Sequence, residues 1–143
     1  MAGVREISAH PVLARAVTGD VIAADVPLSF WGGFDPDSGV IIDQRHPLAG
    51  ECAIGRVLVI PAGRGSCSGS GVLLESIQNG TAPAAIITAR VDPIIGLGAV
   101  LGDELCGNHP AVLVVAEEDR RRLFTGMAVS IADDGRITIL DEL

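Results

Sequence analysis

The chain has 143 residues, 48% hydrophobic and 20% charged, which is enough for one globular domain with a substantial core. We expect a single domain over residues 1–143. Its formal net charge of −8 argues against nucleic-acid binding, which needs a basic surface. No apolar run is long enough to cross a membrane, and no signal peptide is visible at the amino terminus, so we expect a cytoplasmic protein.

The set of reactive side chains is short. All ten basic residues are arginines and tyrosine is absent, which excludes a lysine Schiff base, a Walker-type phosphate loop and a phenolic general acid. The three cysteines, Cys52, Cys67 and Cys106, are scattered and odd in number, as expected for reduced thiols. No Cys-x-x-Cys, His-x-His or His-Glu-x-x-His spacing occurs, so we expect no metal site within this chain.

The first third of the chain predicts strands and loops. Strands are expected near 5–10, 12–18 and 20–25, with a turn at Gly19-Asp20. Residues 27–39 then hold three of the four aromatic residues among turn formers, which indicates a loop that either plugs the core or lines a cleft. A short strand is predicted over 40–43.

The middle of the chain predicts a βαβαβ unit. Apolar strands at 56–60, 84–89 and 111–115 alternate with two helices. The first helix runs from about 70 to 79 and ends at Gly80, and the second starts at Asp92-Pro93 and ends near Leu105. Such a unit forms a parallel layer with right-handed crossovers.

A short helix over 117–124 and a hairpin complete the chain. The hairpin joins 129–131 to 136–139 across Asp134-Gly135. The predicted fold class is therefore α/β, with a mixed sheet, open or closed into a barrel, around the central βαβαβ unit.

The segment Gly63–Gly71, here called the serine loop, has the sequence Gly-Arg-Gly-Ser-Cys-Ser-Gly-Ser-Gly and joins the strand at 56–60 to the following helix. Free backbone N–H groups at a helix start bind anions, and Arg64 adds a cation beside them. An ordinary polar connection with a helix cap is the alternative.

Two chemical interpretations of this loop remain open. Gly65-Ser66-Cys67-Ser68-Gly69 matches a nucleophile elbow, which would make Cys67 the nucleophile of a thiol hydrolase with His46 or His109 as its base. Alternatively, Ser66 is an acid/base serine whose alkoxide is stabilised by the surrounding amides and Arg64. Because the chain supplies few partner groups, the second interpretation implies half of an active site, completed by another polypeptide. A non-catalytic docking domain that binds an anion is a third possibility.

Three segments together resemble the small subunit of the aconitase X family, namely Pro27–Gly33, Ile42–Gly50 and Arg64–Gly71. The resemblance extends from about Gly19 to Val115. It implies the swivelling β/β/α domain of aconitase-type hydro-lyases. It also implies a large subunit that holds an iron or iron–sulfur centre and most substrate-binding residues, with no metal bound by this chain alone.

The resemblance also implies residue roles. Aconitases carry Gly-Ser-Ser-Arg-Glu-His in this domain, and its first serine removes the substrate proton. Gly65-Ser66-Cys67 matches the first three positions, so Ser66 inherits the role of the base. Ser68-Gly69-Ser70 replaces Arg-Glu-His, so this chain has no arginine at that position to bind a substrate carboxylate. Asp25 matches the last acid of the Gly-Asp-x-Ile-x-Thr-Asp segment, although Ala24 replaces its threonine.

Members of the family dehydrate cis-3-hydroxy-L-proline or 5-phosphomevalonate, both β-hydroxy carboxylates. The arginine-only basic set and the many Ala and Gly residues favour a bacterial protein and hence the proline substrate. The expected site has Ser66 as the base, surrounded by residues that bind the small carboxylate substrate. These are Arg64, Gly65, Cys67, Ser68, Phe30, Trp31, Gly32, Gly33 and His46.

Overall fold

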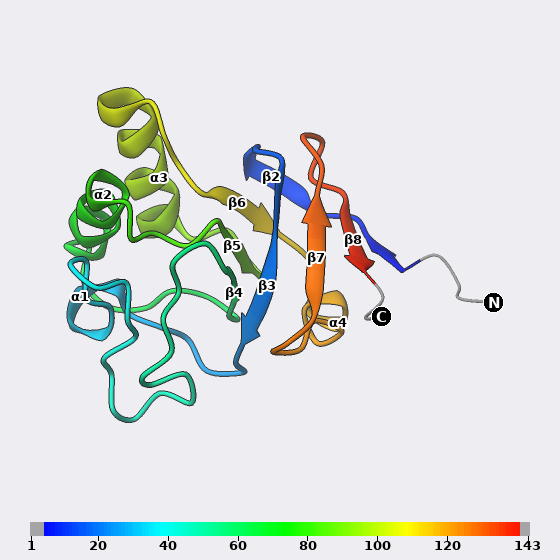
Figure 1. Ribbon diagram of the computed structural model, residues 1–143, viewed down its shortest axis with the longest axis horizontal. Helices are drawn as coiled ribbons and strands as arrows, with labels where there is room; N and C mark the ends of the chain where they lie inside the picture. Colours follow the sequence, from blue (N-terminus) through cyan, green and yellow to red (C-terminus); the bar gives the residue numbers. More distant parts are fainter. Residues whose placement is uncertain (1–4, 141–143) are drawn as a thin grey trace.

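Eight strands form one mixed sheet in the computed structural model, which describes residues 5–140 (Figure 1). Their order across the sheet is β1-β8-β7-β3-β4-β5-β6-β2. The strands are β1 (Glu6–Ile7), β2 (His10–Leu13), β3 (Val17–Ala23), β4 (Val57–Val59), β5 (Ala85–Thr88), β6 (Ala111–Val114), β7 (Ala128–Ile131) and β8 (Ile137–Leu140).

The centre of the sheet is parallel and its flanks are antiparallel. Strands β3, β4, β5 and β6 pair in parallel, whereas β2, β7, β8 and β1 join antiparallel. Helices α2 (Gly69–Asn79) and α3 (Pro93–Cys106) connect the parallel strands and pack against each other beside the sheet (Figure 1). Two four-residue elements complete the list, α1 (Phe30–Gly33) and α4 (Glu117–Arg120).

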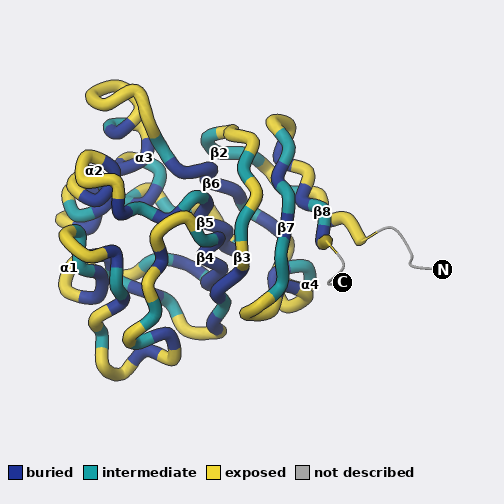
Figure 2. The backbone as a smooth tube through the Cα atoms, in the orientation of Figure 1, coloured by how far each residue is buried: buried dark blue, intermediate teal, exposed yellow. Residues whose placement is uncertain are grey.

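The parallel strands β4, β5 and β6 are buried on both faces (Figure 2). In β4, Leu58 points toward the helices and packs in one cluster with Leu73. Its neighbours Val57 and Val59 point to the other face and pack with residues of the β7–β8 hairpin such as Val129. Because side chains alternate along a strand, burial on both faces produces the uninterrupted apolar runs seen in the sequence.

The predicted βαβαβ unit is confirmed, and so are the predicted start of α3 and the predicted end of α2. Asp92 caps α3 by accepting hydrogen bonds from the N–H groups of Ile94 and Ile95. Gly80 ends α2 in the left-handed region, with φ at 76°. The carboxy-terminal hairpin is also confirmed, as β7 and β8 pair across the turn that contains Gly135.

Three predictions for the flanking segments are wrong. No turn occurs at Gly19-Asp20, because both residues pair with β7 inside the continuous strand β3. The strand predicted at 40–43 is absent, and only isolated bridges form at Val40 and Ile41. The helix predicted over 117–124 ends at Arg120 and continues as turns.

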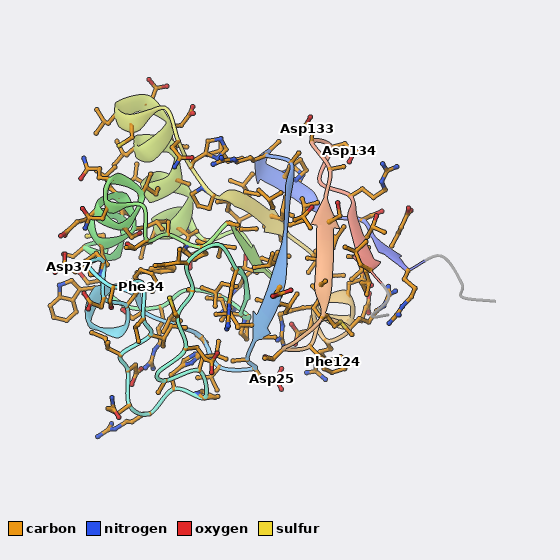
Figure 3. The ribbon with its side chains drawn as sticks, in the orientation of Figure 1. Asp25, Phe34, Asp37, Phe124, Asp133 and Asp134 are labelled. Carbon is orange, nitrogen blue, oxygen red and sulfur yellow. The ribbon has the colours of Figure 1, made fainter. Side chains whose placement is uncertain are left out.

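One edge of the sheet collects the segments that follow the parallel strands. The carboxyl ends of parallel strands lie on the same edge, where α/β proteins bind their ligands. Asp25 follows β3, the serine loop follows β4 and Glu117 follows β6. Figure 3 places Asp25 and Phe124 at one end of the molecule and the hairpin turn at Asp133 and Asp134 at the other. Within residues 5–140, no helix has the length and apolar character to cross a membrane.

Candidate functional site

The serine loop is anchored at its start and exposed in its middle. Leu28 and Gly63 form a parallel bridge, and the Arg64 N–H donates to the Leu28 carbonyl at 3.2 Å. Residues 64–68 are exposed, whereas Gly69 and Ser70 are buried at the start of α2. The exposed part is therefore held between two fixed ends.

Ser66 begins the first turn of the helix. Its hydroxyl oxygen accepts a hydrogen bond from the Ser68 N–H at 3.1 Å, and its carbonyl accepts from the Gly69 N–H at 2.9 Å. The hydroxyl contact resembles that of an N-cap residue, although Ser66 lies three positions before the first helical residue, Gly69, and Ser68 directly before the helix makes no side-chain cap hydrogen bond. The Ser66 oxygen thus faces a backbone donor at the positive end of the α2 dipole.

The same loop contains further free backbone donors. Among the described residues, the N–H groups of Gly65, Ser66 and Cys67 have no hydrogen-bond acceptor. Gly65 has a φ of 95°, and a Cβ there would lie 2.8 Å from the Ser29 hydroxyl oxygen. Successive free amides in such a turn form a small anion-binding concavity.

The segment Phe30–Gly33 is a type II turn instead of a regular helix. Trp31 has φ −76° and ψ 116°, and Gly32 has φ 80° and ψ −14°, the values of the two central residues of that turn. The Ser29 hydroxyl donates to the Trp31 carbonyl at 2.8 Å. Phe30 is buried and its ring packs against Phe34, with centroids 5.3 Å apart.

This turn lies against the serine loop. A Cβ at Gly69 would lie 3.6 Å from the Phe30 Cβ and 3.7 Å from the Trp31 nitrogen. Gly33 is enclosed as well, because a Cβ there would lie 3.2 Å from the Leu28 side chain. The structure therefore brings the predicted residues of the two segments side by side, although their roles in substrate binding stay predictions.

Arg64 makes an ion pair on the exposed side of the loop. Its Nη2 lies 3.6 Å from Asp43 Oδ2, and the other Asp43 oxygen accepts the Arg45 N–H at 3.0 Å. The guanidinium is partly neutralised but remains exposed. It is available to a carboxylate ligand at the cost of one surface ion pair.

His46 is buried, with 4% of its surface exposed. Its Nδ1 accepts the Leu48 N–H at 3.1 Å, so its Nε2 carries the proton and donates to the Val26 carbonyl at 3.0 Å. Both ring nitrogens are thus occupied by backbone groups that tie the loop after Asp43 to the segment after β3. This gives His46 a structural role, and its part in the site stays a prediction.

The structure offers little support for Cys67 as a nucleophile. The thiol is exposed at the carboxyl edge of the sheet, whereas His109 precedes β6 and lies at the amino edge. The His109 Nδ1 lies 2.7 Å from the Pro110 carbonyl, and its Nε2 lies 4.0 Å from Asp103. Since His46 is engaged by the backbone, neither candidate base is presented to Cys67.

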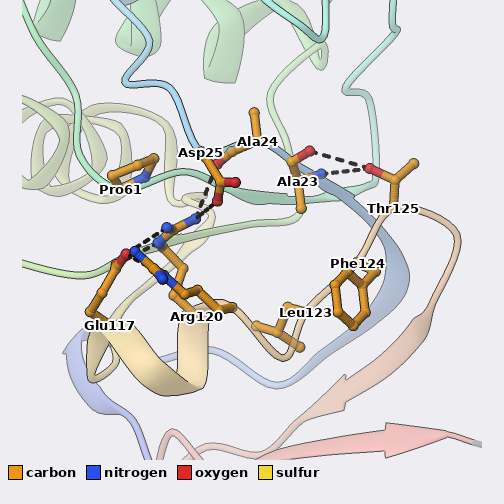
Figure 4. A pocket seen from close by; sticks show the side chains of 10 residues that line it. Ala23, Ala24, Asp25, Pro61, Glu117, Arg120, Leu123, Phe124 and Thr125 are labelled. Carbon is orange, nitrogen blue, oxygen red and sulfur yellow. Dashed lines mark hydrogen bonds and ion pairs between the residues drawn. The ribbon is translucent and has the colours of Figure 1, made fainter.

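A depression of about 680 Å³ opens at the same edge of the sheet (Figure 4). The ends of β3 and β4 form part of its wall through Ala23, Asp25 and Pro61, and the segment after β6 forms the rest. Ser66 is not among its lining residues. No residue of the serine loop lines the depression, so the two are separate features of this edge.

Arg120 is buried in this wall, with 4% of its side chain exposed. Its Nε and Nη2 donate to the two Glu117 carboxylate oxygens, both at 2.7 Å. Its Nη1 donates to the Ala24 carbonyl at 3.2 Å and to Asp25 Oδ1 at 3.1 Å (Figure 4). Its hydrogen bonds lower the pKa of Glu117 to about 2.

A family model for the aconitase X swivel domain matches residues 6–139. The chain therefore belongs to the aconitase X family, as its swivel domain. The fold prediction is confirmed by the crystal structure of Thermococcus kodakaraensis aconitase X in its holo-form. The two superpose with a TM-score of 0.86 at 33% identity, over 95% of this chain and 98% of that one.

Curated relatives carry the swivel domain in two arrangements. A Hypocrea jecorina protein named cis-3-hydroxy-L-proline dehydratase is 45% identical over 114 residues, which is 80% of this chain but 19% of the relative. The swivel domain thus spans about a fifth of that protein. A Methanopyrus kandleri protein named phosphomevalonate dehydratase small subunit is 39% identical, over 95% of this chain and 98% of its own length.

No motif in the sequence indicated that Arg120 belongs to this edge. Its partner Asp25 is 95 positions away, so only the fold brings the two together. The available signal was local, since Glu117 and Arg120 are three residues apart at a helix start, a spacing typical of ion pairs. The same spacing is common on exposed helices, where it has no special role.

The swivel domain also lacks an evident metal site in the part that the structure describes. Within residues 5–140, no group of three or more His, Cys, Asp or Glu side chains comes together to hold a metal ion. The donor set needed for an iron centre is therefore not found here.

Proposed function

We propose that this swivel domain is the small subunit of an aconitase X-type dehydratase and that Ser66 is its proton-abstracting base. The observation that carries the proposal is the Ser68 N–H, which donates to the Ser66 oxygen at 3.1 Å at the start of α2. A hydrogen bond to an oxygen anion stabilises the anion, and so does the positive end of a helix dipole. The loop thus has the donors that a serine alkoxide requires.

The chemical step assigns each group one task. The Ser66 alkoxide takes a proton from the carbon next to the substrate carboxylate, the electrons of that C–H bond form the new C=C bond, and the C–O bond breaks so that the β-hydroxyl leaves as hydroxide. The hydroxide takes up a proton from solvent to become water, and the Ser66 hydroxyl gives its proton back to solvent, which restores the base. The Ser68 N–H stabilises the charge on this oxygen, and the free N–H groups of Gly65 and Cys67 belong to the adjacent residues of the loop. Arg64 is the cation available to the substrate carboxylate.

The remaining groups come from a large subunit in this proposal. Relatives of this chain's own length are named small subunits, and the Hypocrea dehydratase carries the matching segment within a much longer chain. Because the described residues provide no ligand set for an iron or iron–sulfur centre, we assign that centre to the large subunit.

We propose cis-3-hydroxy-L-proline as the substrate, because the two relatives named for that reaction share 45% and 47% identity, against 39% and 43% for two relatives named phosphomevalonate dehydratase small subunit. 5-Phosphomevalonate is the second candidate, since the Methanopyrus relative matches 95% of this chain and 98% of its own length. Both have the β-hydroxy carboxylate that the proposed step requires.

Reconstitution tests this proposal. The chain, the large subunit from the same genome and their mixture are each assayed with both substrates for release of water and formation of the unsaturated product. We expect turnover only in the mixture and with cis-3-hydroxy-L-proline. A thiol hydrolase would instead act alone and lose activity on alkylation of Cys67, and an inactive but stable complex would indicate a docking domain.

A further inference from the structure

Trp31 is exposed and yet fixed in position. Its side chain is 59% exposed, although a tryptophan is the largest apolar group in the chain. The type II turn, the Ser29 hydrogen bond to its carbonyl and the buried ring of Phe30 hold its backbone in one conformation. The fold therefore presents this indole to the outside on a rigid support.

Val91 is a second exposed apolar residue at the serine loop, with 61% of its surface accessible. It directly precedes Asp92, whose carboxylate caps α3. The same carboxylate lies against the loop, since a Cβ at Gly63 would come within 2.6 Å of it. Val91 is thereby fixed next to the start of the serine loop, where strand β5 leads into α3.

The two residues border the loop from different segments. Trp31 approaches it at Gly69, and the α3 side approaches the same glycine through Ile94, whose Cγ2 would lie 3.2 Å from a Cβ there. Ser70 joins these segments further, because its hydroxyl donates to the Ile94 carbonyl at 2.6 Å. The segments that carry Trp31 and Val91 thus both pack against the serine loop, and both of these side chains are exposed.

We infer that Trp31 and Val91 form a docking rim on which the large subunit binds, so that subunit contact closes the site around Ser66. The inference rests on the proposed function. Rigid aromatic residues contribute much of the binding energy of an interface, because little conformational freedom is lost on association. The segments of both residues contact the serine loop, at Gly69 and at Gly63, so a subunit bound there would cover the loop.

The large subunit fits this surface better than other occupants. The matching segment of the Hypocrea relative continues into a chain of which it is 19%, so that protein has a large remainder available to cover the domain. A second copy of this chain would place two serine loops against each other and supply no metal ligands from the described residues.

The test measures the affinity of the purified chain for its large subunit, by titration of a fluorescently labelled chain without substrate. We expect Trp31→Ala to weaken binding about 30-fold or more, the loss typical of an aromatic hot spot. Val91→Ser, which leaves the serine loop intact, is expected to weaken binding about 10-fold and to regain wild-type turnover at saturating large subunit. The control is Leu105→Ala, which removes a 66% exposed leucine at the opposite end of α3.

The outcomes separate this inference from the proposed function. Wild-type affinity for the large subunit in both Trp31→Ala and Val91→Ser overturns the docking rim. A raised KM for the substrate in Trp31→Ala, with unchanged affinity for the large subunit, overturns it too, because Trp31 would then be a substrate contact. Loss of affinity in Leu105→Ala equal to that of the rim variants overturns it as well. If the wild-type chain does not bind the large subunit at all, the proposed function itself fails. Thermal unfolding of each variant verifies that it is folded.

Discussion

Ser66 has two tasks at the start of α2, as a helix cap and as the proposed base. Replacement by alanine removes both, whereas asparagine keeps an oxygen that can accept the Ser68 N–H. We therefore expect Ser66→Ala to lower the free energy of unfolding by about 0.5–2 kcal/mol and Ser66→Asn to change it by only a few tenths. Urea denaturation of the isolated chain measures both. Equal stability of Ser66→Ala and the wild type would show that the 3.1 Å contact contributes no cap.

Gly65 sets the shape of the loop around that serine. Its φ of 95° and the Ser29 oxygen 2.8 Å from a Cβ position leave no room for a side chain. We expect Gly65→Ala to destabilise the chain by about 1–3 kcal/mol. Gly71→Ala is the matched control, because a Cβ there meets nothing within 4 Å and alanine favours the helix. Denaturant midpoints that fall equally in both variants would contradict this account.

At the residue scale, the sequence was most informative where the chemistry is local. The glycines and serines of the serine loop indicated backbone donors at a helix start, and the structure places them there. His46 could not be judged in this way, because its buried bonds to Val26 and Leu48 depend on the path of a loop with no regular structure. Arg120 was missed because its partner lies far along the chain.

Among the elements, helices α2 and α3 determine how firmly the serine loop is supported. A Cβ at Gly98 would lie 2.9 Å from the Ser70 carbonyl oxygen and 3.1 Å from the Leu73 side chain, so the two helices touch at this glycine. We expect Gly98→Ala to cost about 1–3 kcal/mol, because the neighbouring backbone must move.

Gly96→Ala is the control on the same helix. A Cβ there would meet only Val12, at 3.8 Å, which is an ordinary contact. Alanine should therefore stabilise α3 by about 0.5–1 kcal/mol through helix propensity. The comparison is made by thermal and urea unfolding. A neutral Gly98→Ala would show that the helices separate more easily than this packing suggests.

Helix α4 is tied to the end of β3 by an ion pair whose strength depends on pH. Arg120 holds the pKa of Glu117 at about 2 in the folded chain, below the ordinary value of 4.5. A lowered folded-state pKa stabilises the fold above the unfolded value and loses this effect as pH falls through the folded value. The contribution of Glu117 is thus complete above about pH 4.5 and disappears toward pH 2.

Glu117→Gln should therefore flatten the decline in stability between those two pH values. Urea midpoints measured across the range compare it with the wild type, and Glu118→Gln, which removes one carboxylate from the same helix, controls for charge alone. If the urea midpoint of Glu117→Gln fell with pH as steeply as that of the wild type, the proposed origin of the lowered pKa would be refuted.

Elements with a repeating apolar pattern were predictable and the irregular ones were not. The strands and helices of the βαβαβ unit bury both faces or carry clear caps, so their sequence determines them locally. Strand β3 was interrupted in the prediction because Gly19-Asp20 is a common turn pair, yet pairing with β7 keeps it extended. At 40–43, apolar residues suggested a strand, but only Ile41 is buried, Ile42 is exposed, and the segment forms single bridges in place of a strand pairing.

On the scale of the whole molecule, the carboxyl edge of the parallel strands collects every feature with a proposed role. The serine loop, the Trp31 turn and the Asp25–Arg120–Glu117 cluster all follow from the ends of β3, β4 and β6. A parallel sheet places these ends together whatever their separation in sequence. The parallel sheet therefore explains why these segments share one edge, whereas the contacts between them could be identified only from the structure.

The turnover of Ser66 variants in the assembled enzyme tests the central claim most directly. With the large subunit at saturation, Ser66→Ala and Ser66→Asn should both lower kcat at least about 100-fold, the usual contribution of a general base. Both variants should still bind the large subunit. The control Ser130→Ala replaces a serine within β7 and should keep wild-type turnover. Substantial turnover in Ser66→Ala, with intact assembly, would contradict the assignment of Ser66 as the base.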